Sequence, residues 1–348
     1  MGIRNLHDFL RKSAPHVYRD VSLSDYAFKT IAIDLSIYLC KYKSTFKEKW
    51  LDAFLNMMCQ LRENDIHFIF IFDSKSPPEK EHEKRLRMLQ REKLREKVND
   101  MKTGLDSYTQ TGAMNGFLQQ YLKKKNKTFP NSSQSVAFLW EELDRLKGNI
   151  LDIQGSDFEI LKELFTILRV PFFWAHSEAE ATCAHLCLNG VVDAVMTEDT
   201  DILAYGCPLF LHRINIGNNS ISQIRMIDVL RALGLNYDEF LDFCIMCGTD
   251  YNPNIKNIGN ERAYKLIKDF RRIDRIPDLD TRVLNHNRVR ELFQNKIDFQ
   301  LPIGMSLVCG YPDQNQLHFF LFNNNWNIEV SRVMKAFVTS TSDLKFQT

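Results

Sequence analysis

Three short apolar runs that each end at an acidic residue constrain the fold of this chain most. The runs and their acids are residues 30–33 before Asp34, residues 67–72 before Asp73, and residues 194–197 before Glu198 and Asp199. Each run is apolar nearly throughout instead of alternating, which is typical of strands buried on both faces of a parallel sheet. Helix-patterned segments lie between the runs, including residues 50–63 and 158–168. The sequence therefore predicts a doubly wound α/β fold with a mainly parallel sheet and flanking helices.

The acids fall where sheets of this kind bind ligands, which is outside the carboxyl ends of the strands. Carboxylates gathered in one cleft raise one another's pKa unless cations neutralise them. Hard oxygen ligands suit Mg²⁺ or Mn²⁺, and a pair of such ions could hold a phosphodiester, activate water and stabilise the departing 3′ oxygen. The strand ends therefore indicate a metal site and phosphodiester hydrolysis.

Two local patterns add acids to this group. Residues 176–181 are typical of a capped helix start, in which Glu178 and Glu180 lie among small alanines. Asp199 and Asp201 are two residues apart in an extended segment, so they lie on the same side of it. Taken alone, acids near a helix start are also typical of an ordinary surface that matches the helix dipole.

A further acid lies in the C-terminal part, which is largely helical in pattern. Residues 248–251 are Gly-Thr-Asp-Tyr, and a turn containing Gly259 precedes a helix expected to start near Asn260. This favours a helix-hairpin-helix over about residues 244–270, whose exposed backbone N–H groups can bind a phosphate. An ordinary antiparallel helix pair gives the same pattern.

The middle of the chain is strongly polar. Residues 79–98 carry dense charge of both signs, which fits a solvated helix with i,i+4 ion pairs and also a basic helix over a nucleic-acid strand. Residues 101–135 are polar and rich in glycine, which predicts a mobile insertion that splits the α/β domain. Its lysine run at 123–125 fits a solvated loop, and it also fits a phosphate contact or an import signal.

Composition excludes several classes of protein. The eight cysteines lack the spacing of a secreted disulfide framework, and the Cys244–Cys247 pair has no second pair for zinc. No apolar stretch approaches the ~20 residues of a membrane span, and no signal-peptide pattern precedes the first motif. We therefore expect an intracellular protein that does not enter a membrane.

In their order and separations, these motifs match a known family: the sequence resembles the flap endonuclease and XPG-type 5′ nucleases. The matching blocks are Met1-Gly2-Ile3, Ile33-Asp34-Leu35-Ser36, Phe72-Asp73-Ser74-Lys75 with Pro77-Pro78, Ser177-Glu178-Ala179-Glu180-Ala181, Thr197 to Gly206, and Gly248-Thr249-Asp250-Tyr251. The resemblance reaches at least Phe270. It implies a PIN-like fold with a helical arch insertion and a C-terminal helix-hairpin-helix region.

The resemblance also implies a two-metal active site in which seven acids bind the ions directly or through water. These acids are Asp34, Asp73, Glu178, Glu180, Asp199, Asp201 and Asp250. Their retention argues against an inactive relative, because a structural descendant has no physical reason to keep carboxylates that repel one another. Lys80 and Arg87 are the implied active-site cations, with Lys84 as a competitor because of a one-residue insertion near Ser76.

A second implied group contacts DNA. It consists of Gly2, Tyr38, Lys84, Lys256, Gly259 and Arg262. Tyr38 matches an aromatic that stacks on a base, although core packing also explains it. Gly2 would lie near the active site once Met1 is removed, or would only ease entry into a helix. The hairpin departs from the family at Asn257, which tolerates left-handed geometry in place of glycine, and at Glu261, which replaces a common lysine and weakens phosphate attraction.

Four regions follow from the resemblance. They are an N-terminal nuclease region at 1–100, a flexible arch or insertion at 101–135, an internal nuclease region at 136–222, and a helical region at 223–348 that holds duplex DNA through its hairpin. The implied activity is 5′-flap incision at single-strand/duplex junctions in DNA replication, repair or recombination, with or without 5′–3′ exonuclease activity. A Holliday-junction resolvase of the same family, a non-catalytic junction-binding scaffold and an RNA-cleaving PIN-like domain are the alternatives.

The expected cofactors are two Mg²⁺ ions, for which Mn²⁺ can substitute, and a K⁺ ion at the helix-hairpin-helix. The expected partner is branched or flapped DNA, bound by a monomer in the nucleus or another site of DNA replication. Residues 314–321 depart from a sliding-clamp box because Leu321 stands where the second aromatic belongs. We interpret them as a buried amphipathic segment.

Overall fold

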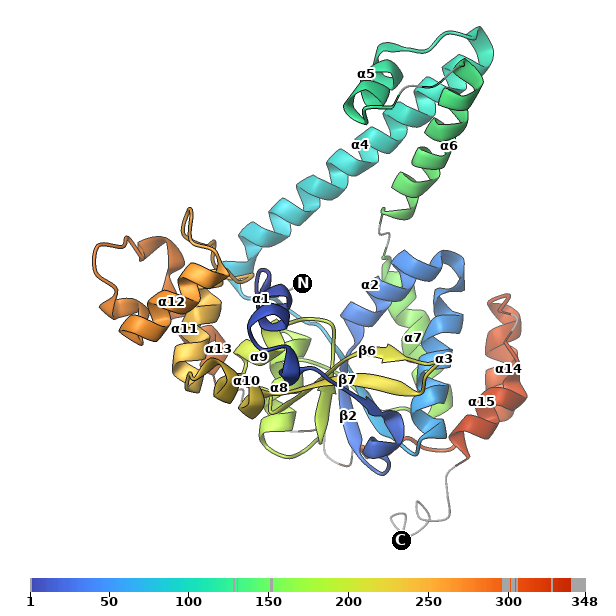
Figure 1. Cartoon of the computed structure of the whole chain (residues 1–348). Helices are drawn as coiled ribbons and strands as arrows, with labels where there is room; N and C mark the ends of the chain where they lie inside the picture. The colour runs from blue at the N-terminus through green and yellow to red at the C-terminus, as the bar shows by residue number, and fades with distance from the viewer. Residues whose placement is uncertain are drawn as a thin grey trace. The chain divides into compact units, whose positions relative to one another are not determined.

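The computed structural model describes residues 2–127, 129, 131–150, 153–295, 301, 304, 306–326 and 328–338, and the chain forms two compact units (Figure 1). The first unit consists of Met1–Leu39, Leu51–Glu81 and Gln154–Thr348, and the second of Cys40–Trp50 and His82–Ile153. Within the described residues, every helix is too short or too polar to cross a membrane.

A seven-stranded sheet forms the centre of the first unit. Its strands are β1 (Arg19–Ser22), β2 (Thr30–Asp34), β3 (His67–Phe72), β4 (Phe172–Trp174), β5 (Ala194–Met196), β6 (Leu209–Asn215) and β7 (Ser220–Arg225). Their order is β1-β7-β6-β5-β2-β3-β4, in which the five strands from β6 to β4 are parallel and β7 is antiparallel to both its neighbours. The three apolar runs are β2, β3 and β5, so the prediction of a mainly parallel sheet is confirmed.

The helices of this unit lie on both faces of the sheet. They are α1 (Leu6–Ser13), the start of α2 (Leu35–Phe46), α3 (Trp50–Glu63), α7 (Gly155–Leu168), α8 (Ala179–Leu188), α9 (Asp201–Ala204), α10 (Met226–Leu233), α11 (Tyr237–Cys247), α12 (Asn260–Phe270), α13 (His286–Gln294), α14 (Gln314–Asn323) and α15 (Val330–Phe337). α8 packs against β2, β3 and β5. On the opposite face, Phe70 of β3 stacks on Phe165 of α7 at 4.3 Å and meets Phe54 of α3 at 5.5 Å, measured between ring centroids. Because strand side chains alternate between faces, Ile69 and Ile71 belong to the core on the α8 side.

The second unit is helical. It contains α4 (Glu81–Thr111), α5 (Gly116–Lys124) and α6 (Ser132–Gly148), whose buried side chains form one core that includes Met101, Leu118 and Leu139. The side chain of Asn115 caps α5 by accepting from Leu118 N at 3.0 Å. It also lies so close to Gly104 that a Cβ there would come within 2.8 Å of the Asn115 amide nitrogen. Helices therefore occupy much of residues 101–135, the segment in which composition predicted a polar insertion.

Candidate functional site

Acids from four neighbouring strands meet at the carboxyl edge of the sheet. Asp34 is the last residue of β2, and Asp73 directly follows β3. Glu178 lies between β4 and α8, and Asp199 lies between β5 and α9. Because β5, β2, β3 and β4 are parallel neighbours, their connections all place a carboxylate at one edge, as expected for doubly wound sheets.

Six of the seven predicted acids are almost completely buried. Their exposed fractions are 1% for Asp34, 3% for Glu178, 8% for Glu180, 3% for Asp199, 2% for Asp201 and 7% for Asp250. Asp73 is partly exposed. Burial of so many carboxylates is unfavourable unless cations compensate their charge.

The pKa values of four of these carboxyls are raised, because burial disfavours their charged form. Burial raises the pKa of Asp34, and the charges of Asp73 and Asp199 raise it further. Burial likewise raises the pKa of Glu180, Asp199 and Asp201. The protein alone therefore disfavours the fully ionised cluster.

Hydrogen bonds from neighbouring residues orient several of the carboxylates. Asp73 Oδ1 accepts from Ala179 N at 2.9 Å, which joins the end of β3 to the first residue of α8. Asp199 Oδ1 accepts from Asp201 N at 3.0 Å. Asp34 Oδ2 accepts a longer bond from Thr197 Oγ1 at 3.4 Å. These bonds orient the acids without neutralising them.

Lys80 brings a positive charge into the cluster. Its Nζ lies 2.6 Å from Glu178 Oε1 and 3.3 Å from Asp250 Oδ2. Burial alone would lower the pKa of Lys80, but the charges of Glu180, Glu178 and Asp250 outweigh burial and raise it. Lys80 is therefore held as an ammonium group among the acids, and its part in catalysis stays a prediction.

Two tyrosines hold Glu178 through a chain of hydrogen bonds, and neither of them was assigned a role from the sequence. Tyr251 donates a hydrogen bond to Glu178 Oε2, and the hydroxyl of Tyr205 is hydrogen-bonded to that of Tyr251. Both phenols are buried, and burial raises the pKa of each, so they stay protonated. The only sequence signal was their presence in the motifs that carry Asp201 and Asp250.

The acid cluster fits divalent metal ions by its chemistry. Asp201 Oδ1 is buried without a hydrogen-bond partner within the described part of the chain, which suits an oxygen that serves as a ligand. Over the same residues, no three His, Cys, Asp or Glu side chains are arranged to hold an ion, and Lys80 lies between Glu178 and Asp250. The donor set, all carboxylate oxygen, is the one that Mg²⁺ and Mn²⁺ prefer.

Gly2 lies directly against this cluster. Its φ is +83°, and a Cβ at this position would come within 1.9 Å of Asp199 Oδ1 and 2.7 Å of Asp201 N. Both the backbone conformation and the available space therefore require glycine. The structure therefore places Gly2 beside the acids, and its role toward DNA stays a prediction.

The other predicted residues lie elsewhere. Tyr38 is completely buried, which favours the core-packing alternative over base stacking. Lys84 and Arg87 belong to α4 in the second unit, where Arg87 pairs with Glu83 at 3.3 Å. Their roles stay predictions.

The predicted hairpin lies between α11 and α12, which pack against each other. Gly259 is the N-cap of α12, and Asn257 adopts the left-handed conformation with φ of +63°. Lys256, Gly259 and Arg262 are exposed. Glu261 on the first turn of α12 pairs with Lys12 of α1, so one of the basic groups beside this hairpin is already neutralised.

Acids gathered at the carboxyl edge of such a sheet are placed where a ligand binds, and with metal ions they can support phosphodiester hydrolysis. Two family models match the chain, the XPG N-terminal domain over residues 1–94 and the XPG I-region over residues 169–250. The probable RAD2-like endonuclease 076L of Invertebrate iridescent virus 3 is 33% identical over 329 residues, which cover 85% of this chain and 86% of that protein. The chain belongs to the XPG family, whose members are metal-dependent nucleases.

Solved structures of family members share the fold. The catalytic core of Rad2 in complex with a DNA substrate aligns with a TM-score of 0.67 at 17% identity and covers 97% of this chain and 99% of that one. Flap endonuclease-1 from Methanococcus jannaschii aligns with a TM-score of 0.62 at 21% identity, and the alignment covers 95% of this chain and 97% of that one.

Proposed function

We propose that this chain is a structure-specific 5′ flap endonuclease that hydrolyses DNA phosphodiesters at single-strand/duplex junctions. The observation that carries the proposal is the buried acid cluster with Lys80 inside it, at the carboxyl edge of the sheet. The names of its relatives, which include RAD2-like endonucleases and flap endonuclease 1, support the choice of substrate.

The seven acids would hold two Mg²⁺ ions, for which Mn²⁺ can substitute. When bound, such ions would polarise the phosphate, activate a water molecule and stabilise the leaving oxygen. Lys80 offsets part of the negative charge that would otherwise repel a phosphodiester. Tyr251 holds one oxygen of Glu178 so that the carboxylate keeps its orientation.

The remaining site residues are proposed to bind DNA. Lys256, Gly259 and Arg262 lie near the N-terminus of α12, where backbone N–H groups can donate hydrogen bonds to a phosphate. A K⁺ ion is also proposed at this hairpin. Gly2 allows close approach to the acids. Arg87 or Lys84 of α4 would add the second active-site cation. The nuclease regions are then residues 1–100 and 136–222, with the arch at 101–135 and the duplex-binding region at 223–348.

We also propose that the protein acts as a monomer where DNA is replicated or repaired. A sliding clamp is not part of this proposal. Residues 314–321 belong to α14, on which the side chains of Leu317, Phe320 and Leu321 are buried and not available to a partner, whereas Phe319 is exposed.

The test is a panel of end-labelled substrates in Mg²⁺: a 5′ flap, a nicked duplex, a four-way junction, and a matched RNA flap. The proposal expects cleavage of the DNA flap near its junction, and a nicked duplex reports any 5′–3′ exonuclease activity. Preferred cleavage of the four-way junction would establish the resolvase alternative. Cleavage of the RNA flap without cleavage of DNA would establish the PIN-like ribonuclease. The variant Asp199→Asn should bind the flap and not cleave it, whereas equal cleavage by this variant would refute the proposed site.

A further inference from the structure

An ion pair joins α13 to the short turn that carries Lys80. Arg288 of α13 donates from Nε to Glu79 Oε1 at 2.7 Å, across 209 residues of sequence. Glu79 is the middle residue of the 3₁₀ turn Pro78–Lys80, and Lys80 is its last. Arg288 lies outside both segments that the family models match.

The turn leaves little freedom between the two side chains. Pro77 and Pro78 restrict its φ angles, and Lys80 N donates to Pro77 O at 3.1 Å. From this turn Glu79 meets α13, while Lys80 reaches into the carboxylates. Because the backbone between them is stiff, holding Glu79 also holds the position from which Lys80 extends.

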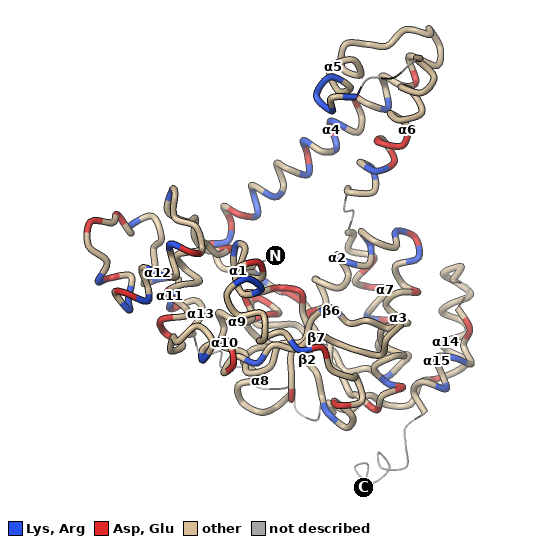
Figure 2. The backbone as a smooth tube through the Cα atoms, in the orientation of Figure 1, with Lys and Arg blue, Asp and Glu red and all other residues tan. Residues whose placement is uncertain are grey.

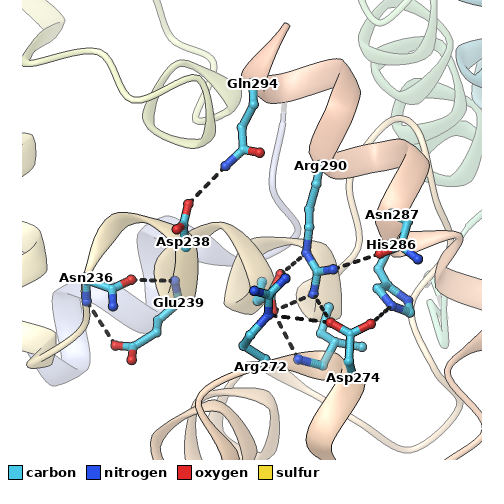
Figure 3. A network of polar contacts seen from close by, with 11 residues as sticks. Asn236, Asp238, Glu239, Arg272, Asp274, His286, Asn287, Arg290 and Gln294 are labelled. Atoms are coloured by element: carbon cyan, nitrogen blue, oxygen red, sulfur yellow. Dashed lines mark hydrogen bonds and ion pairs between the residues drawn. The ribbon is translucent and has the colours of Figure 1, made fainter.

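A polar network holds α13 in turn (Figure 3). Arg290 donates to both oxygens of the buried Asp242 on α11, at 2.6 and 2.7 Å, and to Asp274 at 2.9 Å. His286 contacts the other oxygen of Asp274 at 2.7 Å. Arg288 therefore projects from a helix that is fixed to α11, whose C-terminal loop carries Asp250.

Lys80 needs such a support because of its place in the chain. α4 begins at Glu81, which is also the last residue of this segment of the first unit. Charged residues of both signs lie along this start of the long helix (Figure 2). Lys80 therefore directly precedes the helix through which the chain passes into the second unit.

We propose that Arg288 is a positioning residue, which through Glu79 holds the Lys80 ammonium among the active-site carboxylates. Its effect on cleavage rests on the proposed function, but the anchoring of Lys80 does not. The competing explanation is that Arg288 contacts a DNA phosphate directly and that Glu79 is incidental.

The anchoring is tested without substrate by acylating the metal-free protein with acetic anhydride and following each lysine by mass spectrometry. The Lys80 side chain is 12% exposed, so it should react slowly in the wild type. Glu79→Gln and Arg288→Gln should each speed its modification by about threefold or more, as expected for local opening. Arg282→Gln, which breaks an exposed pair with Asp280, is the matched control and should not change it. Unchanged Lys80 reactivity in both test variants would overturn the proposal.

Cleavage gives a second, separate measurement. Single-turnover flap cleavage should slow about three- to tenfold in Glu79→Gln and in Arg288→Gln, with little change in flap affinity. The reversed pair Glu79→Arg with Arg288→Glu should recover part of the rate. In a Lys80→Ala background, Arg288→Gln should have no further effect, and an undiminished effect there would contradict action through Lys80. If the wild type cleaves nothing, the proposed function fails while the labelling result still decides the anchoring.

Discussion

The hydroxyl of Tyr251 donates a hydrogen bond to Glu178 Oε2, while the other oxygen of the same carboxylate faces Lys80 at 2.6 Å. Both oxygens of Glu178 are thus engaged by residues that lie far from it in the sequence, one before it and one after it. A carboxylate held in this way enters the active site with one orientation, which is what a metal ligand requires.

Removal of the Tyr251 hydroxyl should therefore reduce catalysis more than binding. We expect Tyr251→Phe to lower single-turnover flap cleavage about 10- to 100-fold, the usual cost of losing a group that orients a ligand. Flap affinity, measured by fluorescence anisotropy without divalent ions, should change little. Tyr237→Phe is the control, because that hydroxyl bonds to the carbonyl oxygen of Ala204 instead of an acid. Similar losses in both variants would assign the effect to general packing.

Gly2→Ala should slow flap cleavage far more than the addition of a single methyl group suggests. The added Cβ would overlap Asp199 Oδ1, so either the N-terminal segment or the carboxylate must move. A displacement of about 1 Å at a reacting centre can cost ~100-fold in rate, and we expect a loss of that order in flap cleavage. Gly155→Ala, where a Cβ would meet nothing within 4 Å, should leave the rate unchanged. Wild-type activity in Gly2→Ala would show that the close approach to Asp199 is not maintained during catalysis.

Asp201→Asn should stabilise the metal-free protein while abolishing cleavage. Burial raises the pKa of Asp201, and the charges of Asp199 and Asp250 raise it further. In addition, Asp201 Oδ1 lacks a hydrogen-bond partner among the described residues. A neutral amide in place of this carboxyl removes the cost of ionising it in the cluster, which should be visible as a higher melting temperature in EDTA. The stabilisation that Mg²⁺ gives the wild type should shrink in this variant. Asp193→Asn, which removes an acid outside the cluster, is the control. A lower melting temperature for Asp201→Asn in EDTA would contradict the argument.

The position of the acids at the carboxyl edge of the sheet could be predicted from the sequence, because the signals there are local. Asp34 and Asp73 each end a run of apolar residues, and a parallel sheet necessarily gathers such ends. By contrast, β1 is a four-residue strand of largely exposed polar side chains, and nothing in its composition distinguishes it from a loop. It forms only because β7 offers an antiparallel edge about 200 residues later in the chain.

The supporting contacts of the site were beyond prediction for the same reason. The bond from Tyr251 to Glu178 spans 73 residues, and that from Arg288 to Glu79 spans 209. No periodicity links residues so far apart, so only the folded arrangement identifies them. Tyr38 shows the converse, because its motif matched a base-stacking aromatic while its complete burial favours packing.

His7 should make the protein less stable in mild acid. Burial, the neighbouring His212 and nearby arginines lower the pKa of His7 from 6.5 to about 4. Between these values the unfolded chain binds a proton that the folded protein does not, so stability is complete above pH 6.5 and falls as the pH decreases. The loss is at most about 3 kcal/mol, and less because His7 is partly exposed to solvent. His7→Gln should flatten the dependence of the free energy of unfolding on pH from 7 to 4.5, whereas His16→Gln, at an exposed site, should not. Parallel curves for wild type and His7→Gln would rule out this assignment.

The hairpin offers a test of how strongly the protein grips duplex DNA. Glu261 stands at the start of α12 and pairs with Lys12, so it repels phosphate and also neutralises a neighbouring cation. Glu261→Lys should therefore increase flap affinity, and the slope of log K against log salt should steepen by about one to two units, since each added phosphate contact contributes about 0.9. Glu159→Lys on α7 makes the same change of charge away from the hairpin and should leave the slope nearly unaltered. If both variants steepen the slope equally, net charge and not the hairpin controls binding. If neither does, the N-terminus of α12 does not contact the duplex.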